Sequence, residues 1–304
     1  MRVEASLKLI PILLIAGVLT GCAVATPLAA ATENPVVIET LIVATSDIQR
    51  FPTSTPTTTA SPSVTPTETG CQESSGSVAR VQIPSQFLAS PLWVSVYTPP
   101  CYADQPEEAY PVLYLLHGQN MDDSYWQTLG ATKIADEAIQ AGERPFLIVM
   151  PYEERNFEPI ADSGFDEALI RELIPWVDGQ YPTCTARECR AIGGISRGGG
   201  WAVDAALRNF ELFGTMGAHS VGLLGGDSWQ VAQLLNTYDT SAFPRIYMDR
   251  GENDFLAEYI DQFEAVLTAS GITHEFVISP GAHDGNYWLA HVQEYMRWYM
   301  AGWE

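Results

Sequence analysis

Ser196 is the residue whose setting most suggests chemistry. It stands in Gly194-Ile195-Ser196-Arg197-Gly198, a G-x-S-x-G pattern where an apolar run, expected to be a strand, ends and a helix is expected to begin. A serine on such a tight turn holds its hydroxyl above the sheet, and the flanking glycines remove side chains that would clash at the bend. The pattern predicts a nucleophile at Ser196. A glycine-rich helix start without chemistry is the alternative.

A serine hydroxyl is a weak nucleophile unless a base takes its proton. Four histidines follow Ser196 in the chain: His219, His274, His283 and His291. His283 lies in a loop directly after the last predicted strand, where the carboxyl ends of strands gather ligands. His274 begins that strand, His291 belongs to the last helix, and His219 follows too soon to leave room for an acid between. We predict His283 as the base, with a solvated loop histidine as the alternative.

The base in turn needs a carboxylate that orients its imidazole. The segment MDRGENDFL, residues 248–256, offers three acids. Asp249 falls within a predicted strand, whereas Glu252 and Asp254 are expected on the loop at its carboxyl end. We predict Asp254 as the acid, with Glu252 in reserve and a solvated turn as the alternative.

The negative oxygen that develops during nucleophilic attack requires two backbone N–H donors. One is expected from Arg197, directly after the serine. The other is expected from Gln119, because YLLHGQN, residues 114–120, ends a buried run with His117-Gly118. A His-Gly pair is also common in ordinary turns, so the prediction for Gln119 depends only on the position of this pair at the end of the buried run.

The elements that must position these residues alternate between short apolar runs and longer amphipathic segments. Such a pattern is typical of a mainly parallel sheet covered by helices on both faces, so the predicted fold class is α/β. The expected strands are 78–83, 92–97, 111–116, 145–150, 190–195, 245–250 and 274–279, and the expected helices are 131–140, 165–177, 201–209, 257–269 and 288–300.

The chain of 304 residues is 46% hydrophobic and has a formal charge of -22. This composition supplies one substantial core, and so acidic a surface disfavours nucleic-acid binding. The first residues combine Arg2 and Lys8 with an apolar run that is too short to span a bilayer, followed by Leu19-Thr20-Gly21-Cys22.

That N-terminal segment resembles a bacterial lipoprotein signal, 1–21, which implies lipidation of Cys22 and a protein exported to the cell surface. An ordinary secretory signal is the alternative. Residues 22–70 include a stretch rich in Thr, Ser and Pro and are expected to form a tether, although residues 23–50, with the run NPVVIETLIVATSDI at 34–48, stay unassigned. The predicted catalytic domain is 71–304.

Four further cysteines, Cys71, Cys101, Cys184 and Cys189, suggest two disulfides in an exported chain. Three connectivities are possible, of which Cys71–Cys101 with Cys184–Cys189 is the most local. Free buried thiols are the alternative. No histidine stands at a ligand spacing from either pair, so no metal is expected.

Five segments together resemble the Putative esterase family of α/β-hydrolases, which includes S-formylglutathione hydrolase, feruloyl and acetyl-xylan esterases, enterochelin esterases and mycolyltransferases: PVLYLLHG, ELIPWVDGQYPT, RAIGGISRGGGWAVDAALRNFELFG, DRGENDFL and GAHDGNYW. The resemblance implies Ser196, Asp254 and His283 as the triad, with the amides of Gln119 and Arg197 as the oxyanion hole. Many relatives carry Met or Gln where this chain has Arg197. The family also has a proline at the place of Pro175, which implies a kinked helix.

These features predict a monomeric, lipid-anchored serine esterase that needs no cofactor and acts on esters of carbohydrate or other polar alcohols. The short segment between Val221 and Pro244 indicates an open site without a large lid. Trp126, Trp229 and Trp288 are candidates for stacking on sugars or aromatic acyl groups. The alternatives are an acyltransferase that passes the acyl group to a sugar, and a binding lipoprotein without catalysis.

Overall fold

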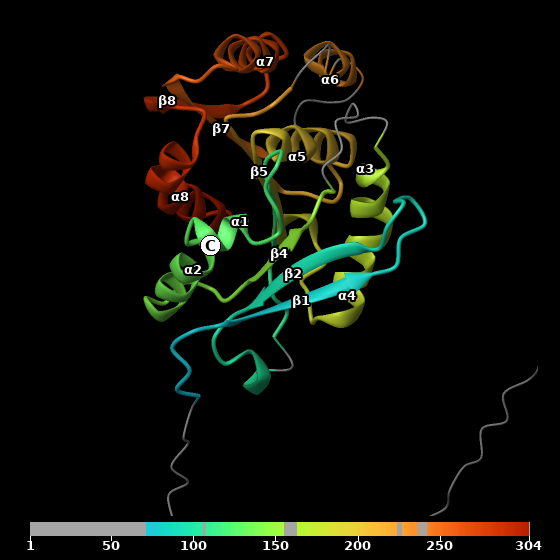
Figure 1. Ribbon diagram of the computed structural model, residues 1–304, viewed down its shortest axis with the longest axis vertical. Helices are drawn as coiled ribbons and strands as arrows, with labels where there is room; N and C mark the ends of the chain where they lie inside the picture. Colours follow the sequence, from blue (N-terminus) through green and yellow to red (C-terminus); the bar gives the residue numbers. More distant parts are fainter. Residues whose placement is uncertain are drawn as a thin grey trace, which may run out of the picture. The chain divides into compact units, whose positions relative to one another are not determined.

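Strands from the whole length of the folded region pair into one sheet (Figure 1). The computed structural model describes residues 71–105, 108–154, 163–223, 227–235, 237 and 242–303. These residues belong to one compact unit, Thr65–Glu304. The predicted signal, Cys22 and the tether lie outside the described residues. None of the described helices is long and apolar enough to cross a membrane.

The sheet has the strand order β1-β2-β4-β3-β5-β6-β7-β8. The two pairings β1–β2 and β2–β4 are antiparallel and all the others are parallel. The parallel strands therefore present their carboxyl ends at one edge. The bounds are β1 (Ser77–Ile83), β2 (Leu92–Thr98), β3 (Val112–Leu116), β4 (Leu147–Pro151), β5 (Arg190–Ile195), β6 (Thr215–His219), β7 (Arg245–Asn253) and β8 (His274–Ala282).

Helices cover both faces of the sheet (Figure 1). One apolar cluster packs α3–α4, α5 and α7 on one face, and a second packs α1, α2 and α8 on the other. The α/β prediction is confirmed. The helices are α1 (Tyr125–Thr128), α2 (Ala131–Gln140), α3 (Phe165–Ala168), α4 (Ile174–Gln180), α5 (Arg197–Arg208), α6 (Asp227–Leu235), α7 (Ala257–Ala269) and α8 (Gly285–Met300), with short turns at Tyr102–Asp104 and Arg187–Cys189.

The strand β6 was not among the expected elements, because its sequence TMGAH contains a glycine and ends in polar residues. Its glycine makes room for a side chain from α8. A Cβ at Gly217 would lie 2.0 Å from the hydroxyl of Tyr299, and one at the paired Gly193 of β5 would lie 1.6 Å from it. Both neighbouring strands therefore have a glycine at the position where Tyr299 needs space.

Pro175 lies near the start of α4, and the turn before it, Leu169–Leu173, is a π-helix. Proline has no N–H to continue the α-helical ladder, and a local change of helix type is a usual response. The long helix expected from 165 therefore consists of three successive segments that end at Gln180. Its apolar stripe is buried against the sheet, as the spacing predicts.

Two disulfides are present, Cys71–Cys101 and Cys184–Cys189. The first joins the chain before β1 to the turn after β2, and the second closes the loop between α4 and β5. This is the most local of the three connectivities. Among the described residues, the one grouping with metal-ligand spacing is Cys71, Glu73 and Cys101. Because both sulfurs are oxidised, the group does not offer thiolate ligands.

Candidate active site

Ser196 occupies the sharp turn between β5 and α5. It adopts φ 55° and ψ -120°, a conformation that costs a residue with a side chain about 1–3 kcal/mol. Hydrogen bonds hold its backbone in place: its N–H donates to the carbonyl oxygen of His219 at 2.8 Å, and its carbonyl accepts from Gly222 at 2.8 Å and Gly200 at 3.1 Å. The strained turn is therefore fixed by β6 and by the loop that follows it.

The glycines around the serine are required by close approach. A Cβ at Gly194 would lie 2.2 Å from the carbonyl carbon of Gly198, and a Cβ at Gly198 would lie 2.4 Å from the carbonyl oxygen of Leu116. These contacts bring the first turn of α5 against the end of β3. Any side chain at either position would open the turn that presents Ser196.

His283 reaches the serine from the turn between β8 and α8. Its Nε2 lies 2.8 Å from the Oγ of Ser196, and its Nδ1 lies 2.9 and 3.1 Å from the two carboxylate oxygens of Asp254. An Nδ1–H that donates to the carboxylate leaves Nε2 as the acceptor for the hydroxyl proton. The turn itself is fixed because Asp284 caps α8, accepting from the N–H groups of Asn286 and Tyr287 at 2.9 and 3.1 Å.

Asp254 follows β7 and its side chain is fully buried. Burial by itself raises the pKa of this carboxyl, but hydrogen bonds from His283 and from the N–H of Leu256 hold the pKa below its ordinary value. The group is therefore a carboxylate at neutral pH. Glu252, the reserve candidate, is exposed near the end of β7, and no hydrogen bond joins it to His283 in the described part of the chain.

The turn after β3 lies against the serine turn. It is closed by a hydrogen bond from Met121 N–H to the Gly118 carbonyl at 3.1 Å, with Asn120 at φ 64°. A Cβ at Gly118 would lie 3.3 Å from the carbonyl oxygen of Ile195, so Gln119 follows a residue that packs directly against the serine turn. Arg197 is the first residue of α5, where backbone N–H groups have no acceptor within the helix.

His117 was not assigned a role from the sequence, yet it locks this turn. Its Nδ1 lies 2.8 Å from the Gly118 carbonyl, and its Nε2 accepts from the N–H of Glu153 at 3.0 Å. Burial lowers the pKa of His117, which favours the neutral ring that this pattern needs. The histidine thereby ties the end of β3 to the end of β4, and its place at a strand end was the available signal.

Glu153 and Arg197 form a pair beside Ser196. The Oε2 of Glu153 lies 3.5 Å from the Nε of Arg197, and both side chains are largely buried. Burial raises the pKa of Glu153 to about 7, although the nearby guanidinium opposes the rise. A cation is unfavourable at a helix N-terminus, so the acid compensates for Arg197 at the start of α5.

A buried cluster around Asp249 was also missed. Its Oδ1 accepts from His219 Nδ1 at 2.8 Å, and its Oδ2 accepts from the hydroxyls of Tyr287 and Tyr295 at 2.7 and 2.6 Å. The Nε2 of His219 lies 2.9 Å from the Tyr299 hydroxyl. The cluster joins β6 and β7 to α8, the helix that follows His283.

The expected roles of two tryptophans in binding were wrong. Trp126 is 1% exposed and donates from Nε1 to the carbonyl of Leu116 at 3.0 Å, so it anchors the end of β3. Trp288 is 3% exposed and packs edge-on against His283, with ring centroids 5.2 Å apart. Neither presents a free face. The side chain of Trp229 lies outside the described residues.

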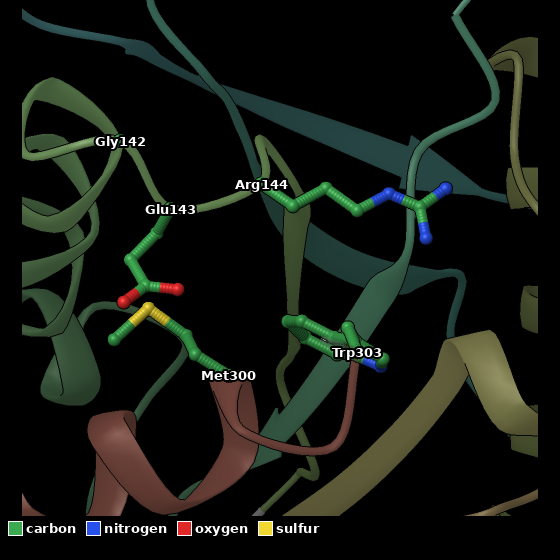
Figure 2. Close-up of a pocket in the computed structure, with 5 residues that line it drawn as sticks. All are labelled: Gly142, Glu143, Arg144, Met300 and Trp303. Atoms are coloured by element: carbon green, nitrogen blue, oxygen red, sulfur yellow. The ribbon is translucent and has the colours of Figure 1, made fainter.

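A cleft of about 770 Å³ opens next to the Glu153–Arg197 pair. Its lining mixes polar and apolar side chains, among them Leu88, Trp93, Tyr152, Glu153 and Phe165. A smaller pocket of about 220 Å³ lies between α8 and the loop before β4 (Figure 2). That loop is at the amino ends of the parallel strands, so the smaller pocket is at the opposite edge of the sheet from Ser196.

Residues 85–298 match the family model described as "Putative esterase". The chain belongs to this esterase family. A curated relative, the endo-1,4-beta-xylanase/feruloyl esterase of Xylanibacter ruminicola, is 31% identical over an alignment of 225 residues that covers 70% of this chain and 30% of the relative. An esterase of Mycobacterium tuberculosis is 26% identical, covering 57% of this chain and 48% of the relative. The chain thus spans less than half the length of these curated members of the esterase family.

Solved structures show the same fold for members of the esterase family. A ferulic acid esterase superposes with a TM-score of 0.68 at 22% identity, covering 75% of this chain and 100% of that one. The S-formylglutathione hydrolase of Staphylococcus aureus superposes with a TM-score of 0.62 at 18% identity, covering 75% and 98%. The architecture is that of the α/β-hydrolases.

Proposed function

We propose that this member of the esterase family is a serine carboxylesterase that works through an acyl-enzyme. The observation that carries the proposal is the continuous hydrogen-bonded chain from Ser196 Oγ through His283 to the buried carboxylate of Asp254. Such a chain, on a strained strand-to-helix turn, is the arrangement that turns a serine hydroxyl into a nucleophile.

In the proposed first half-reaction, Ser196 Oγ attacks the ester carbonyl carbon while His283 Nε2 takes its proton. The N–H groups of Gln119 and Arg197 stabilise the negative oxygen of the tetrahedral intermediate. The C–O bond to the alcohol then breaks, and the imidazolium gives its proton to the departing oxygen. Asp254 orients the ring and stabilises its positive charge throughout.

In the second half-reaction water takes the place of the alcohol. His283 removes a proton from the water as its oxygen attacks the acyl carbon, and the returning proton restores the Ser196 hydroxyl when the acid leaves. The chemistry consumes one water per ester and needs no redox partner.

For substrates, we propose acyl, feruloyl or acetyl esters of carbohydrate or another polar alcohol. The xylanase/feruloyl esterase relative and an acetyl esterase relative from Caldicellulosiruptor saccharolyticus support this class. The cleft beside Glu153 and Arg197, with both polar and apolar lining, suits an ester whose two halves differ in polarity.

A panel of p-nitrophenyl and feruloyl esters, assayed with the full chain and with Ser196→Ala, tests the reaction class. We expect hydrolysis of the panel by the wild-type chain and a loss of about 10³-fold or more in kcat for Ser196→Ala. Absence of hydrolysis together with no fluorophosphonate labelling of Ser196 would leave a binding protein. Transfer of the acyl group to an added sugar, in preference to water, would identify an acyltransferase.

We also propose that the protein is exported and held at the cell surface by a lipid on Cys22, because a diacylated cysteine anchors a protein stably whereas one chain does not. Incorporation of labelled fatty acid into the full chain, lost in Cys22→Ser, is the expected result. Release of both forms into the medium without label would contradict it.

A further inference from the structure

Phe255 presents an aromatic face to solvent directly beside the histidine of the site. The side chain is 74% exposed, more than any other large apolar side chain recorded as exposed in the described ranges. Isolated exposed apolar residues are common on proteins and need no explanation by themselves. Here the position decides, because the centroid of the Phe255 ring lies 4.5 Å from that of the His283 imidazole.

The backbone around Phe255 is held on both sides. The N–H of Leu256 donates to Asp254 Oδ1 at 2.8 Å, and the N–H of Ala257 donates to the Asp254 carbonyl at 3.1 Å. Asp254 and Leu256 are both buried. The phenyl ring therefore projects from a fixed turn, which reduces the conformational entropy that a ligand would have to remove.

Two aromatic rings contact the imidazole of His283. The ring of Trp288 is buried, whereas the ring of Phe255 is exposed. The His283 side chain itself is only 7% exposed. Of the two rings that contact the imidazole, only Phe255 is open to a substrate group that comes from solvent.

We propose that Phe255 is the platform for the alcohol half of the substrate and that this alcohol is a neutral sugar. The inference rests on the proposed esterase function, in which the imidazolium gives its proton to the departing alcohol oxygen. That oxygen must lie next to His283 Nε2 when the bond breaks. The remainder of the alcohol is then within reach of the ring that flanks the imidazole.

The charge distribution of the Phe255 phenyl ring favours a sugar as the alcohol. The face of a phenyl ring carries partial negative charge and attracts polarised C–H groups, such as those on the flat side of a sugar ring. A neutral sugar also avoids the repulsion that an anionic alcohol would meet from a chain with a formal charge of -22. A long aliphatic alcohol would gain nothing specific from one isolated ring.

The test compares two esters of one acid, methyl ferulate and a feruloylated arabinose oligosaccharide, in wild type, Phe255→Leu and Phe255→Tyr. Leucine keeps an apolar cover on the imidazole but removes the flat ring, whereas tyrosine keeps the ring. We expect Phe255→Leu to raise KM for the sugar ester by about tenfold, with a much smaller effect on methyl ferulate and with kcat largely retained. Phe255→Tyr should keep the wild-type KM for both esters.

Phe87→Leu is the matched control, since Phe87 is 39% exposed and packs against Arg171, and no ring contact joins it to His283 in the described part of the chain. Phe87→Leu should leave KM and kcat unchanged for both esters. Equal losses on the two esters in Phe255→Leu would show that the ring acts only by covering the imidazole, and no loss on either would remove Phe255 from the site; both overturn the proposal. Hydrolysis of methyl ferulate by wild type and not by Ser196→Ala supports the esterase function in every one of these cases.

Discussion

The carbonyl oxygen of His219 accepts a hydrogen bond from the N–H of Ser196 at 2.8 Å, while the imidazole of the same residue is bonded to Asp249. His219 is fully buried at the end of β6. The strand that supports the strained serine is thus itself fastened by a buried carboxylate. The protein thus has two Asp–His pairs. Asp249 and His219 join β7 to β6, whereas Asp254 and His283 extend to the Ser196 hydroxyl.

Removing the Asp249 carboxylate should therefore destabilise the whole domain. Asp249→Ala leaves the His219 imidazole and two tyrosine hydroxyls without their buried acceptor, and we expect a loss of about 3–5 kcal/mol in the free energy of unfolding. Tyr295→Phe removes one of the three hydrogen bonds and should cost about 1–2 kcal/mol. Urea denaturation followed by circular dichroism measures both. A loss below that of Tyr295→Phe in the alanine variant would contradict this role.

Gly198 offers a test of the close approach at the serine turn. An added Cβ would lie 2.4 Å from the Leu116 carbonyl oxygen, so Gly198→Ala must push α5 away from β3. A displacement of about 1 Å at a reacting group costs on the order of 10²-fold in rate, and we expect that loss in kcat/KM.

The control for Gly198 is Gly179, which lies in α4 with no atom outside its own helix backbone within 4 Å of an added Cβ. Gly179→Ala should keep full activity and should raise the free energy of unfolding by about 0.5–1 kcal/mol, because alanine is the better helix former. Full activity in Gly198→Ala would show that the turn tolerates a side chain.

Much of the fold could be predicted because most of the strands are buried on both faces. Continuous apolar runs of the length of β3 and β4 are typical of strands buried on both faces, and the helices between them show apolar stripes. The carboxyl ends of the strands then place Ser196, Asp254 and His283 at one edge of the sheet. The order of these three residues along the chain was therefore enough to predict them as site residues.

What could not be predicted depends on side chains distant in sequence. The glycine in β6 makes room for Tyr299, and the polar residue at the carboxyl end of that strand, His219, forms hydrogen bonds with Asp249 and Tyr299. No local pattern contains this information. The prediction that the tryptophans stack on substrate was wrong for a similar reason, since Trp126 is buried by contacts with a strand end that sequence spacing does not show.

The choice between two acids after β7 is tested by a matched pair of substitutions. Asp254→Asn keeps the shape of the side chain but replaces the carboxylate that holds His283, and kcat should fall by about 10³–10⁴-fold with the fold retained. Glu252→Gln alters an exposed carboxyl without a bond to the histidine and should leave kcat within about twofold. Steady-state kinetics on one feruloyl ester compares them. The opposite ranking would move the acid to Glu252.

Glu153 should make stability depend on pH around neutrality. Burial raises its pKa from 4.5 to about 7 in the folded protein. Between these two values the unfolded chain has lost the proton that the folded chain still holds. Because the folded state then binds more protons, raising the pH favours unfolding, and the penalty is complete above pH 7. The ionised form, although paired with Arg197, is the less stable one in this fold.

Glu153→Gln replaces the carboxyl by a group that resembles its protonated form, so the variant should lack this penalty. Its Tm should exceed that of wild type only slightly at pH 5, and by a margin that grows up to about pH 7.5 and then stays constant. Glu211→Gln, at an exposed position after α5, is the control, because Glu211 is not among the described charges that shift the pKa of Glu153, and its difference from wild type should not change over the same range. Thermal denaturation at half-unit pH intervals gives the three curves. A margin for Glu153→Gln that is the same at pH 5 and pH 8 would mean that the buried carboxyl ionises at its ordinary pKa, and that Arg197 compensates fully for its burial.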